Sequence, residues 1–413
     1  MVMRVLYLLS LRFFHFAVLV SSLFHNKARL FVRGRRGLFR DLQQAVAGWQ
    51  QVVWFHCASL GEFEQGRPVI EQIKQSHPHV KILLTFFSPS GYQVRKNYAF
   101  ADYVTYLPVD GPHAARRFVD IVRPDQVFFI KYEYWYYFLR ALYKRQVPVY
   151  LISAIFRRHQ VFFKWYGGWF RRMLRFFTHL FVQDEASADL LKHYRITQVT
   201  VSGDTRFDRV RQVAGSARAL PLVEQFKGGH FLLVAGSTWP ADEELLARYF
   251  QNTSHDYKML LAPHEVHEQH IQRIMNRFNP DELVRWSEAA AEKMTRARVL
   301  VVDAIGLLSS LYGYGNLAYV GGGFGNGIHN ILEAATYDIP VIFGPNYHKF
   351  KEALDLARLG GAFPQHNYQN FPGLMDDLLE NPRKLKSAGQ IAGDYVRRQA
   401  GATRVILSKV AFY

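Results

Sequence analysis

The sequence predicts an α/β protein built from two successive, doubly wound domains. The chain has 413 residues, which is long for one hydrophobic core and suits two domains. Hydrophobic residues make up 49% of it, so sizeable cores can form. Short apolar runs alternate with helical patterns in two separate series, which is typical of parallel sheets covered by helices.

The apolar runs mark the expected strands of the two sheets. The first series contains six runs, at residues 52–55, 81–85, 103–106, 126–130, 149–152 and 179–182. The second contains five, at residues 230–235, 258–262, 299–302, 317–320 and 340–343. Doubly wound sheets bind ligands at the carboxyl ends of their strands, so we expect a cleft that both sheets face.

A pause in this alternation indicates the domain boundary. The pause covers residues 201–210 and is followed by a polar stretch with Gly215, Ser216 and Pro221. The sequence therefore predicts three parts: a membrane anchor with its basic flank over residues 1–35, a first Rossmann-like domain over 36–212, and a second over 213–413.

The N-terminal segment is apolar and is followed by positive charge. Residues 5–24 are about long enough to cross a bilayer, although Arg12 and His15 interrupt them. No small-x-small cleavage site follows, which disfavours a signal peptide. Basic residues come next and favour the cytoplasmic side of an anionic membrane: Lys27, Arg29, Arg33, Arg35, Arg36 and Arg40. We expect an anchor that spans the bilayer or lies in its interface; the alternative is a helix packed on the protein's own core.

Charge and cysteine content narrow the functional classes. The formal net charge is +17, which favours an anionic partner such as nucleic acid, an acidic membrane or a phosphorylated substrate. Cys57 is the one cysteine, so the chain has no internal disulfide and no cysteine zinc site. A reducing, cytoplasmic environment is compatible with this content.

The stretch "HCASLGEFEQGRP" places a carboxylate where a strand ends and a helix begins. Glu62 follows the expected strand at 52–55 and would lie in the first helical turn. One interpretation is electrostatic, because acidic residues are favourable at the positive end of a helix dipole. The other is catalytic, with Glu62 as a general base held on a stiff turn.

Two loops of the second domain suit an anionic ligand. In "VAGSTWPADEELL", Gly236 would let a ligand approach the backbone, Ser237 and Thr238 supply hydroxyls, and Pro240 suits the first turn of a helix. A plain loop with a Ser/Thr cap is the alternative.

"YVGGGFGNGIHNILEAATYDIPVIFGP" is a strand, a glycine-rich loop and a helix from about His329. It lacks GxGxxG, so a dinucleotide fingerprint is not supported. Asn330 and Glu333 lie three residues apart and would share a helix face, with Glu333 placed to accept hydrogen bonds from a ribose. The alternative is that Asn330 caps the helix and Glu333 lies on its solvated face.

Two further stretches have competing interpretations. "LAPHEVHEQHI" is not HExxH, because His264 and His267 are three residues apart; we therefore expect no metal there and place His264 at a strand end. Residues 154–177 interleave basic and aromatic side chains, which suits either single-stranded nucleic acid or a membrane headgroup layer. The apolar N-terminus favours the membrane.

Taken in order, nine short stretches resemble the family of transferases of 3-deoxy-D-manno-oct-2-ulosonic acid (Kdo). They are "ASLGE", "SPSGY", "YLPVD", "YEYW", "SGDTRFD", "AGSTWPADEE", "VDAIGLL", "YVGGGFGNGIHNILEAA" and "PVIFGPNYHKFKEA". The resemblance implies a GT-B glycosyltransferase with two Rossmann-like domains facing a cleft and an N-terminal membrane anchor. It implies CMP-Kdo as donor, a lipid A precursor (lipid IVA) as acceptor, no metal or other cofactor, and the cytoplasmic face of the bacterial inner membrane.

The resemblance also assigns roles to individual residues. Glu62 would be the catalytic base, which deprotonates an acceptor hydroxyl while CMP departs and the configuration inverts. Arg206 would steady the leaving phosphate. The residues that would bind the donor lie in the second domain and are Ser237, Thr238, His264, Ile305, Gly306, Asn330 and Glu333. Those that would bind the substrate on the acceptor side lie in the first domain and are Ser59, Gly61 and Glu133.

The chain departs from the family pattern at four positions. His264 stands where the family has a donor-binding arginine, and Leu307 stands where it has a glutamate. Arg206 replaces a lysine of the family. Lys131 replaces the first of two motif acids, so that Glu133 is the one acid of that motif that remains. These departures indicate a divergent branch, which could use a variant sugar or acceptor.

Other functions remain open at this point. They are a GT-B transferase that uses a UDP-sugar on a membrane lipid, a non-catalytic membrane-surface binding protein, and, third, a Rossmann oxidoreductase. Nucleic acid is not expected as a partner, and the sequence leaves the oligomeric state undetermined.

Overall fold

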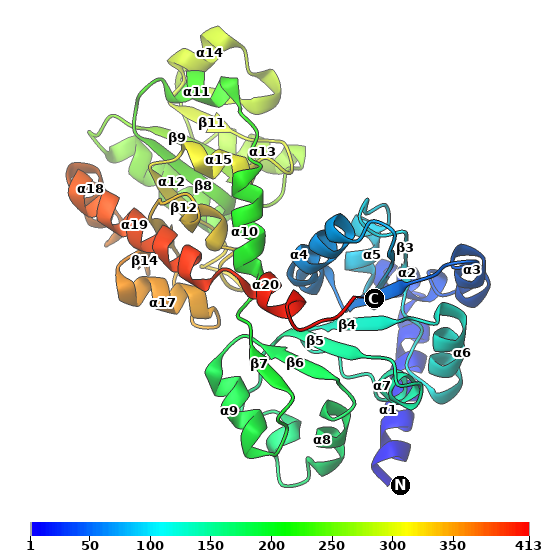
Figure 1. The fold of residues 1–413 in the computed structure, drawn as a ribbon. Coiled ribbons are helices and arrows are strands. Elements are labelled where there is room, and N and C mark those ends of the chain that lie inside the picture. The colour runs from blue at the N-terminus through cyan, green and yellow to red at the C-terminus, as the bar shows by residue number, and fades with distance from the viewer. Residues whose placement is uncertain (1, 413) are drawn as a thin grey trace. The chain divides into compact units, whose positions relative to one another are not determined.

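The computed structural model describes residues 2–412 and divides into two compact units (Figure 1). The first unit comprises Met1–Arg209 together with Ala400–Tyr413, and the second comprises Val210–Gln399. Each unit is an α/β structure around its own parallel sheet, as the sequence predicts.

The first unit contains a seven-stranded parallel sheet in the order β3-β2-β1-β4-β5-β6-β7. From the adjacent central strands β1 and β4, successive strands are added in opposite directions, so the switch point of the topology lies between them. The strands are β1 (Val52–Cys57), β2 (Lys81–Phe86), β3 (Tyr103–Tyr106), β4 (Gln126–Ile130), β5 (Val149–Ala154), β6 (His179–Val182) and β7 (Val199–Val201).

Both faces of this sheet are buried, as expected for parallel strands between helices. Every residue of β1 is buried. Trp54 points into one core with Phe118 and Phe138, while its neighbour Phe55 points into the other and stacks on Phe128. Continuous apolar runs are therefore the correct signature for these strands.

Helices cover the two faces and the edge of this sheet. They are α1 (Val2–Ser21), α2 (Asn26–Arg33), α3 (Leu38–Ala45), α4 (Leu60–Ser76), α5 (Pro89–Arg95), α6 (Pro112–Val122), α7 (Tyr136–Lys144), α8 (Gly168–Leu174), α9 (Glu185–His193) and α20 (Ala402–Leu407), with a 3-10 turn at Val161–Phe163. Helix α10 (Thr205–Gly215) begins in this unit and continues into the second.

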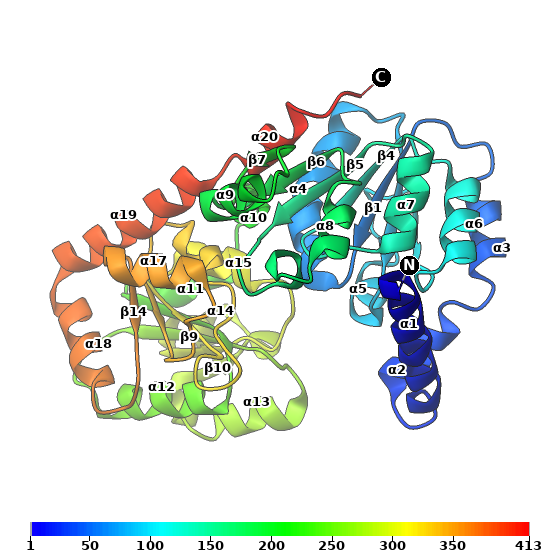
Figure 2. The same cartoon turned by 90° about the horizontal axis from the view of Figure 1, so that it is seen from below.

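Helix α1 is the one described helix long and apolar enough to cross a membrane. It runs beside α2 (Figure 2). One side of α1 packs on the first unit, where the Tyr7 hydroxyl donates a hydrogen bond to Asp110 Oδ2 at 2.7 Å. The helix thus combines a docked face with an exposed one.

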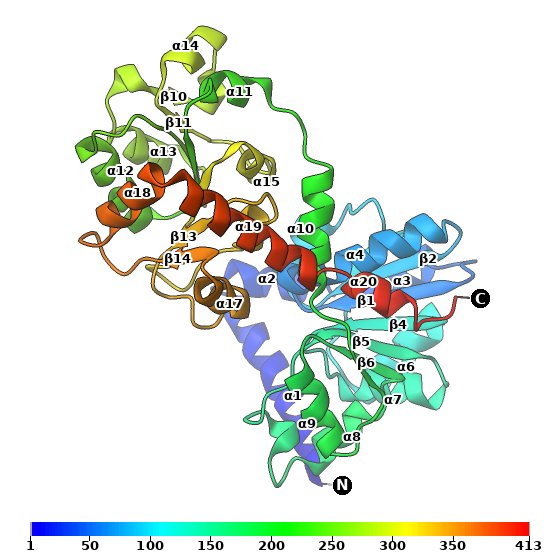
Figure 3. The same ribbon diagram turned by 60° about the vertical axis from the view of Figure 1, so that its left-hand side comes forward.

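The last residues of the chain return to the first unit, whereas the sequence assigned everything after residue 213 to the second domain. Helix α20 lies beside α4 (Figure 3). Ile406 and Val410 are buried in the same core as Phe63, and Asp208 accepts hydrogen bonds from the backbone of Gly401 and Thr403. These contacts join positions nearly 200 residues apart, which no local pattern reveals.

The second unit repeats the architecture with the strand order β10-β11-β9-β8-β12-β13-β14, all parallel. Its switch point lies between β8 and β12. The strands are β8 (Leu232–Thr238), β9 (Lys258–Pro263), β10 (Leu283–Arg285), β11 (Val299–Val301), β12 (Leu317–Val320), β13 (Val341–Phe343) and β14 (Ala362–Pro364).

The helices of the second unit are α11 (Pro221–Lys227), α12 (Pro240–Asn252), α13 (Glu268–Met275), α14 (Ala291–Arg296), α15 (Leu308–Leu311), α16 (Leu332–Ala335), α17 (Lys351–Leu359), α18 (Phe371–Glu380) and α19 (Pro382–Gln399), with 3-10 turns at Pro280–Glu282, Trp286–Glu288 and Tyr312–Tyr314.

All eleven expected strands are present, and the structure adds β7, β10 and β14. Each of these three is an edge strand of three residues. Runs this short have no detectable period, and only pairing with a neighbouring strand makes them part of a sheet.

Replacing Asp110 with asparagine should change how stability depends on pH. Burial raises the pKa of Asp110 to about 6, despite hydrogen bonds from Tyr7 and from the backbone of Tyr137 and Phe138. Between roughly pH 4 and 6 the folded chain therefore keeps a proton that the unfolded chain releases, so this group lowers the free energy of unfolding as pH rises, by up to about 3 kcal/mol.

We therefore expect the Tm of Asp110→Asn, relative to wild type, to increase from pH 4 to pH 7 in thermal unfolding followed by circular dichroism. A relative Tm that stays constant over this range would contradict the assignment.

Candidate active site

Several of the residues predicted to carry function lie at the switch points of the two sheets, whereas Arg206, His264, Ile305 and Gly306 follow the other strands β7, β9 and β11. In the first unit, Glu62 follows β1 and Glu133 follows β4. In the second unit, Ser237 and Thr238 end β8, and the loop after β12 leads to Asn330. Strand order alone places ligands at such points in doubly wound sheets.

Glu62 lies in the first turn of α4 with its side chain half-exposed. The spacing of Ser59 and Glu62 suits a capping box, but Ser59 makes no capping hydrogen bond to the helix backbone. Its hydroxyl donates to the Glu62 carboxylate instead. Gly61 between them is exposed, and a Cβ there would meet open space apart from Ser59 Oγ at 3.8 Å.

The charge of Glu62 acts on the core beneath it. Cys57 ends β1 and is fully buried. Burial raises the pKa of the Cys57 thiol, and the negative charge of Glu62 raises it further. Cys57 is therefore a neutral packing residue and not a reactive thiol.

The other acidic side chains on the same helix are engaged by arginine. Glu64 pairs with Arg67 and Arg95, at 3.7 and 2.7 Å. Glu71 pairs with Arg67 at 2.6 Å and with Arg209 at 3.7 Å. Within the described residues 2–412, no cation pairs with Glu62, whose one hydrogen-bond partner is the neutral Ser59 hydroxyl.

Glu133 is buried in a polar network at the end of β4. Its carboxylate is 2.9 Å from His56 Nε2 and accepts a hydrogen bond from the Trp135 indole. His56 Nδ1 lies 2.9 Å from Thr85 Oγ1, which in turn accepts from the Trp54 indole at 2.8 Å. The Glu133 carboxylate, which the sequence assigns to substrate binding, therefore already has two hydrogen-bond partners within the protein.

Arg206 is tied to α4 through an intermediate carboxylate. Its Nε donates to Asp204 Oδ2 at 2.8 Å, and Asp204 is buried. Asp204 Oδ1 accepts from Gln65 Nε2 at 3.2 Å. Gln65 lies three residues after Glu62 and so on the same side of α4. Arg206 is thus held, through Asp204 and Gln65, to the helix that carries Glu62.

The predicted hydroxyl loop of the second unit belongs to the end of β8. Ser237 is half-buried and has a left-handed backbone with φ of 52°. Thr238 is fully buried, and its hydroxyl donates to Glu243 Oε1 at 3.1 Å. His270 Nε2 lies 3.0 Å from both oxygens of Glu243. Thr238 is thus committed to this network, whereas Ser237 is the more accessible hydroxyl.

Gly236 is needed for packing and does not face an open site. A Cβ on Gly236 would lie 2.1 Å from Tyr312 Oη and 2.6 Å from Leu308 Cδ1. The idea that this glycine lets a ligand approach the backbone is therefore not supported by its surroundings.

His264 stands in a stack of three rings, of which Trp239 and His264 directly follow β8 and β9 and His329 comes from the loop after β12. It lies 4.8 Å from Trp239 and 4.4 Å from His329 between ring centroids. Trp239 Nε1 donates to His329 Nε2 at 3.1 Å. Burial lowers the pKa of His329, and the positive charge of His264 lowers it further. As predicted, His264 directly follows a strand, β9, and it is exposed.

The glycine-rich loop after β12 packs closely on its neighbours. A Cβ on Gly321 would lie 2.4 Å from the carbonyl oxygen of Ser237, and one on Gly323 would lie 2.5 Å from Gly344 Cα. Asp242 joins this loop to the end of β8, because it accepts hydrogen bonds from the backbone of both Trp239 and Gly322.

Asn330 and Glu333 form the predicted pair. Asn330 Nδ2 donates to Glu333 Oε1 at 3.0 Å, and Asn330 Oδ1 accepts from the backbone of Leu332. Helix α16 starts at Leu332 and not near His329. Before the helix begins, the Asn330 side chain accepts a hydrogen bond from the nearby Leu332 backbone, as asparagine commonly does before a helix.

The loop at residues 303–306 is held by an arginine. Arg285 Nε and the backbone of Ser287 donate to Asp303. Partial burial raises the pKa of Asp303, but these hydrogen bonds outweigh it and leave that pKa below its ordinary value. Ile305 is 86% exposed and Gly306 has φ of 87°, so the tip of this loop is open to a ligand.

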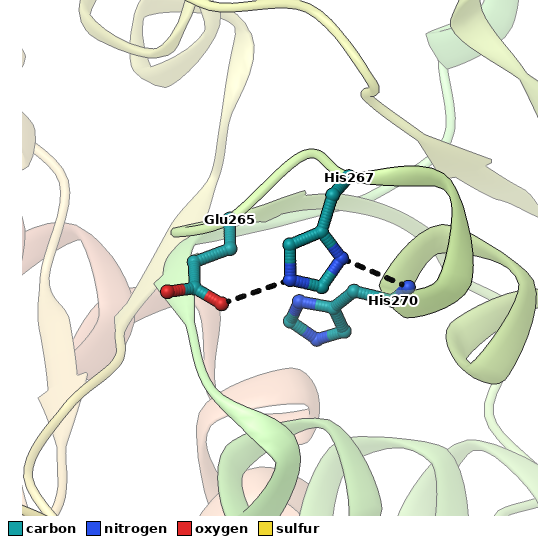
Figure 4. A group of neighbouring side chains, drawn as sticks. All are labelled: Glu265, His267 and His270. Atoms are coloured by element: carbon teal, nitrogen blue, oxygen red, sulfur yellow. Dashed lines mark hydrogen bonds and ion pairs between the residues drawn. The ribbon is translucent and has the colours of Figure 1, made fainter.

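Glu265, His267 and His270 lie together at the start of α13, with ligand atoms within 4.8 Å of one another (Figure 4). His267 Nδ1 accepts from the backbone of His270, and its Nε2 lies 3.1 Å from Glu265. Both ring nitrogens of His267 are therefore in use, and the histidine serves as a helix N-cap. The expectation of no metal considered only the spacing of His264 and His267. It overlooked His270, which lies in the first turn of α13 and therefore close to His267.

Three residues that support the site were missed from the sequence: His56, Asp242 and Arg285. His56 and Arg285 lie in strands and Asp242 lies in the first turn of α12, and each holds another polar group in place. A histidine inside the apolar run "VVWFHC" was the one available signal.

Comparison with known proteins finds one group of relatives. The sequence model of the 3-deoxy-D-manno-octulosonic-acid transferases (kdotransferases) matches residues 31–209. A 3-deoxy-D-manno-octulosonic acid transferase of Aquifex aeolicus is 25% identical over 366 residues, which cover 86% of this chain and 95% of that protein. Over most of its length this chain is therefore similar to the Kdo transferases. These comparisons support a glycosyltransferase.

Solved structures agree on the fold. The UDP-GlcNAc 2-epimerase of Neisseria meningitidis covers 86% of this chain and 98% of its own, with a TM-score of 0.58 at 16% identity. MurG of Acinetobacter baumannii covers 87% and 98%, with a TM-score of 0.56 at 12% identity. The two parallel-sheet units are thus those of the GT-B fold, as predicted.

Replacing His56 with alanine should destabilise the first unit. The change leaves the buried carboxylate of Glu133 without one of its two partners, which costs about 3 kcal/mol. The matched control is His56→Gln, which retains a donor and should lose less. Urea unfolding measures both, and equal losses would contradict a specific role for the His56–Glu133 contact.

Replacing Gly236 with alanine should lower the free energy of unfolding by about 1–3 kcal/mol, because the new Cβ overlaps the Tyr312 hydroxyl. Adding Tyr312→Phe removes the overlapping oxygen and should restore part of the loss. Thermal unfolding of the single and double variants tests this, and a double variant no more stable than Gly236→Ala would refute it.

Proposed function

We propose that the protein transfers Kdo from CMP-Kdo to a lipid A precursor, with Glu62 as general base and with inversion at the anomeric carbon. The similarity to Kdo transferases supports Kdo transfer in lipopolysaccharide biosynthesis. The acceptor, the stereochemistry and the residue roles are the parts of the proposal that rest on the site.

The observation that carries the role of Glu62 is its freedom from ion pairing. Of the acidic residues on α4, Glu64 and Glu71 are held by arginines, whereas Glu62 is held by a hydroxyl. A neighbouring cation favours the charged form of a carboxylate and so weakens it as a base. A neutral hydroxyl orients the carboxylate with less loss of basicity, which suits a group that must accept a proton.

The reaction follows from these roles. Glu62 takes the proton of an acceptor hydroxyl as its oxygen bonds to the anomeric carbon of Kdo. The bond from that carbon to the phosphate oxygen breaks, and CMP leaves with the electron pair. Arg206 would steady the charge that develops on the phosphate, although Asp204 shares its guanidinium.

Groups on the second unit would bind the donor. Asn330 holds Glu333 in position, and that carboxylate would accept hydrogen bonds from the ribose. Ser237 at the end of β8 and the exposed tip formed by Ile305 and Gly306 would line the nucleotide, with the buried Thr238 supporting the β8 end through Glu243. The proposed chemistry needs no metal, because protein groups supply the positive charge.

His264 and Leu307 are the positions that would distinguish this protein from its relatives. His264 is exposed and stacked, so it offers a ring face and one titratable charge, where an arginine would offer a permanent charge and a planar fork. Leu307 removes a carboxylate next to the 303–306 loop.

The first test is direct. Purified protein in detergent is incubated with CMP-Kdo generated in situ and tetraacylated lipid A precursor, and the lipid is weighed by mass spectrometry. A mass gain of one or more Kdo units supports donor and acceptor together, and its size counts the sugars added. Absence of any gain from folded protein, combined with competition by UDP but not CMP, would replace the donor with a UDP-sugar.

Glu62→Gln should lower turnover by about 10²–10⁴-fold and leave CMP binding unchanged, because only the proton acceptor is lost. The control is Glu185→Gln, since Glu185 is also an exposed first-turn acid, at the start of α9. This control should keep turnover. Near wild-type turnover in Glu62→Gln would remove Glu62 as the base and favour the purely electrostatic interpretation.

A further inference from the structure

Helix α1 is fastened to the first unit at two places along its length. Near its start the Tyr7 hydroxyl is bonded to the buried carboxylate of Asp110. Seven residues later, Phe14 packs on Phe31 and Phe87 with ring centroids 6.1 and 6.0 Å apart. A helix that crossed a bilayer alone would lose both contacts, and the buried Asp110 would lose its hydroxyl donor.

The opposite side of α1 is an exposed apolar stripe. Residues three or four apart share one side of a helix. Six large apolar side chains follow this spacing, and each is at least 45% exposed: Val2, Leu6, Leu9, Phe13, Phe16 and Val20. A contiguous apolar surface of this kind marks a site that another apolar phase covers.

The polar residues of α1 avoid this stripe. At about 100° per residue, Arg12 and His15 fall on the flank between the docked side and the exposed stripe. A helix that spans places its whole circumference in hydrocarbon, whereas a helix lying in the interface can keep such a flank among the headgroups.

The charged side chains of the N-terminal 40 residues are all positive. The first 40 residues contain no Asp or Glu, and they contain eight Lys or Arg: Arg4, Arg12, Lys27, Arg29, Arg33, Arg35, Arg36 and Arg40. Such a segment attracts an anionic lipid surface. Nucleic acid would also attract the charge, but it would leave the apolar stripe uncovered.

A second exposed aromatic group adjoins α1. Trp165 is 93% exposed and Tyr166 is 51% exposed. Four residues after Trp165, Trp169 packs on Tyr7 of α1 with ring centroids 5.6 Å apart. Residues 154–177 contain six basic side chains and no acidic one. Tryptophan and tyrosine with neighbouring cations suit the boundary between headgroups and acyl chains.

We propose that α1 lies along the surface of an anionic bilayer and does not cross it, with its apolar stripe among the acyl chains and Trp165 as a second contact. This arrangement keeps the Tyr7–Asp110 and Phe14 contacts intact and covers the exposed stripe. The proposal concerns attachment only, so it holds or fails independently of the sugar transferred.

Cysteine accessibility distinguishes the two orientations. Cys57 is fully buried, so Ser10→Cys or Phe24→Cys in the full chain introduces the one exposed thiol within the described residues. Ser10 lies in the middle of α1, outside the apolar stripe. Inverted membrane vesicles from cells producing each variant are treated with a membrane-impermeant maleimide. We expect both cysteines to react without detergent. Protection of the Ser10→Cys thiol until detergent is added would show a spanning helix and overturn the proposal.

Vesicle flotation tests the surface itself. The vesicles contain equal parts of phosphatidylethanolamine and phosphatidylglycerol. The double variant Phe13→Glu/Phe16→Glu should bind them at least about tenfold more weakly than wild type, and Trp165→Ser should bind them several-fold more weakly. The matched control is Leu359→Glu, which alters a 48% exposed leucine of the second unit and should bind as wild type does.

Circular dichroism checks that each variant folds, which is expected because the substituted side chains are exposed. Wild-type vesicle binding by the double variant would overturn the proposal. So would binding to oligonucleotides in place of vesicles, since the charge would then serve a nucleic acid.

Discussion

The two-sided burial of parallel sheets is the constraint on which the rest of this structure depends. Strands covered by helices on both faces leave no room for functional polar groups along their length. All six residues of β1 are buried, and its one polar member, His56, is satisfied by Thr85 and Glu133. Chemistry is therefore confined to the carboxyl edge, and the strand order selects the switch points within that edge.

The carboxylates on α4 and after β4 have different roles, because each has different hydrogen-bond or ion-pair partners. Glu62 is oriented by a hydroxyl, Glu64 and Glu71 by arginines, and Glu133 by a buried imidazole and an indole. The arginine pairs fasten α4 to its surroundings, including Arg209 at the boundary of the unit. This division leaves one carboxylate available to accept a proton while the others maintain the frame that holds it.

In the second unit, close backbone packing holds the carboxyl edge of the sheet together. Its glycines bring the loop after β12 against the end of β8, and Asp242 locks the two together. The stacked rings of Trp239, His264 and His329 then form the exposed border of that edge. This border therefore offers aromatic ring faces at the ends of β8 and β9.

Local sequence patterns determined all strands except the short edge strands β7, β10 and β14, the position of Glu62 after β1 and the apolar, basic N-terminus, because each depends on only a few neighbouring residues. Tertiary structure decided what those patterns could not: that α1 docks through Tyr7 on Asp110, 103 positions away, and that α20 returns to the first unit. It also decided that Gly236 makes room for Tyr312. The physical reason is that periodicity reports which side of an element is apolar, whereas the identity of the group that covers that side depends on how distant segments pack.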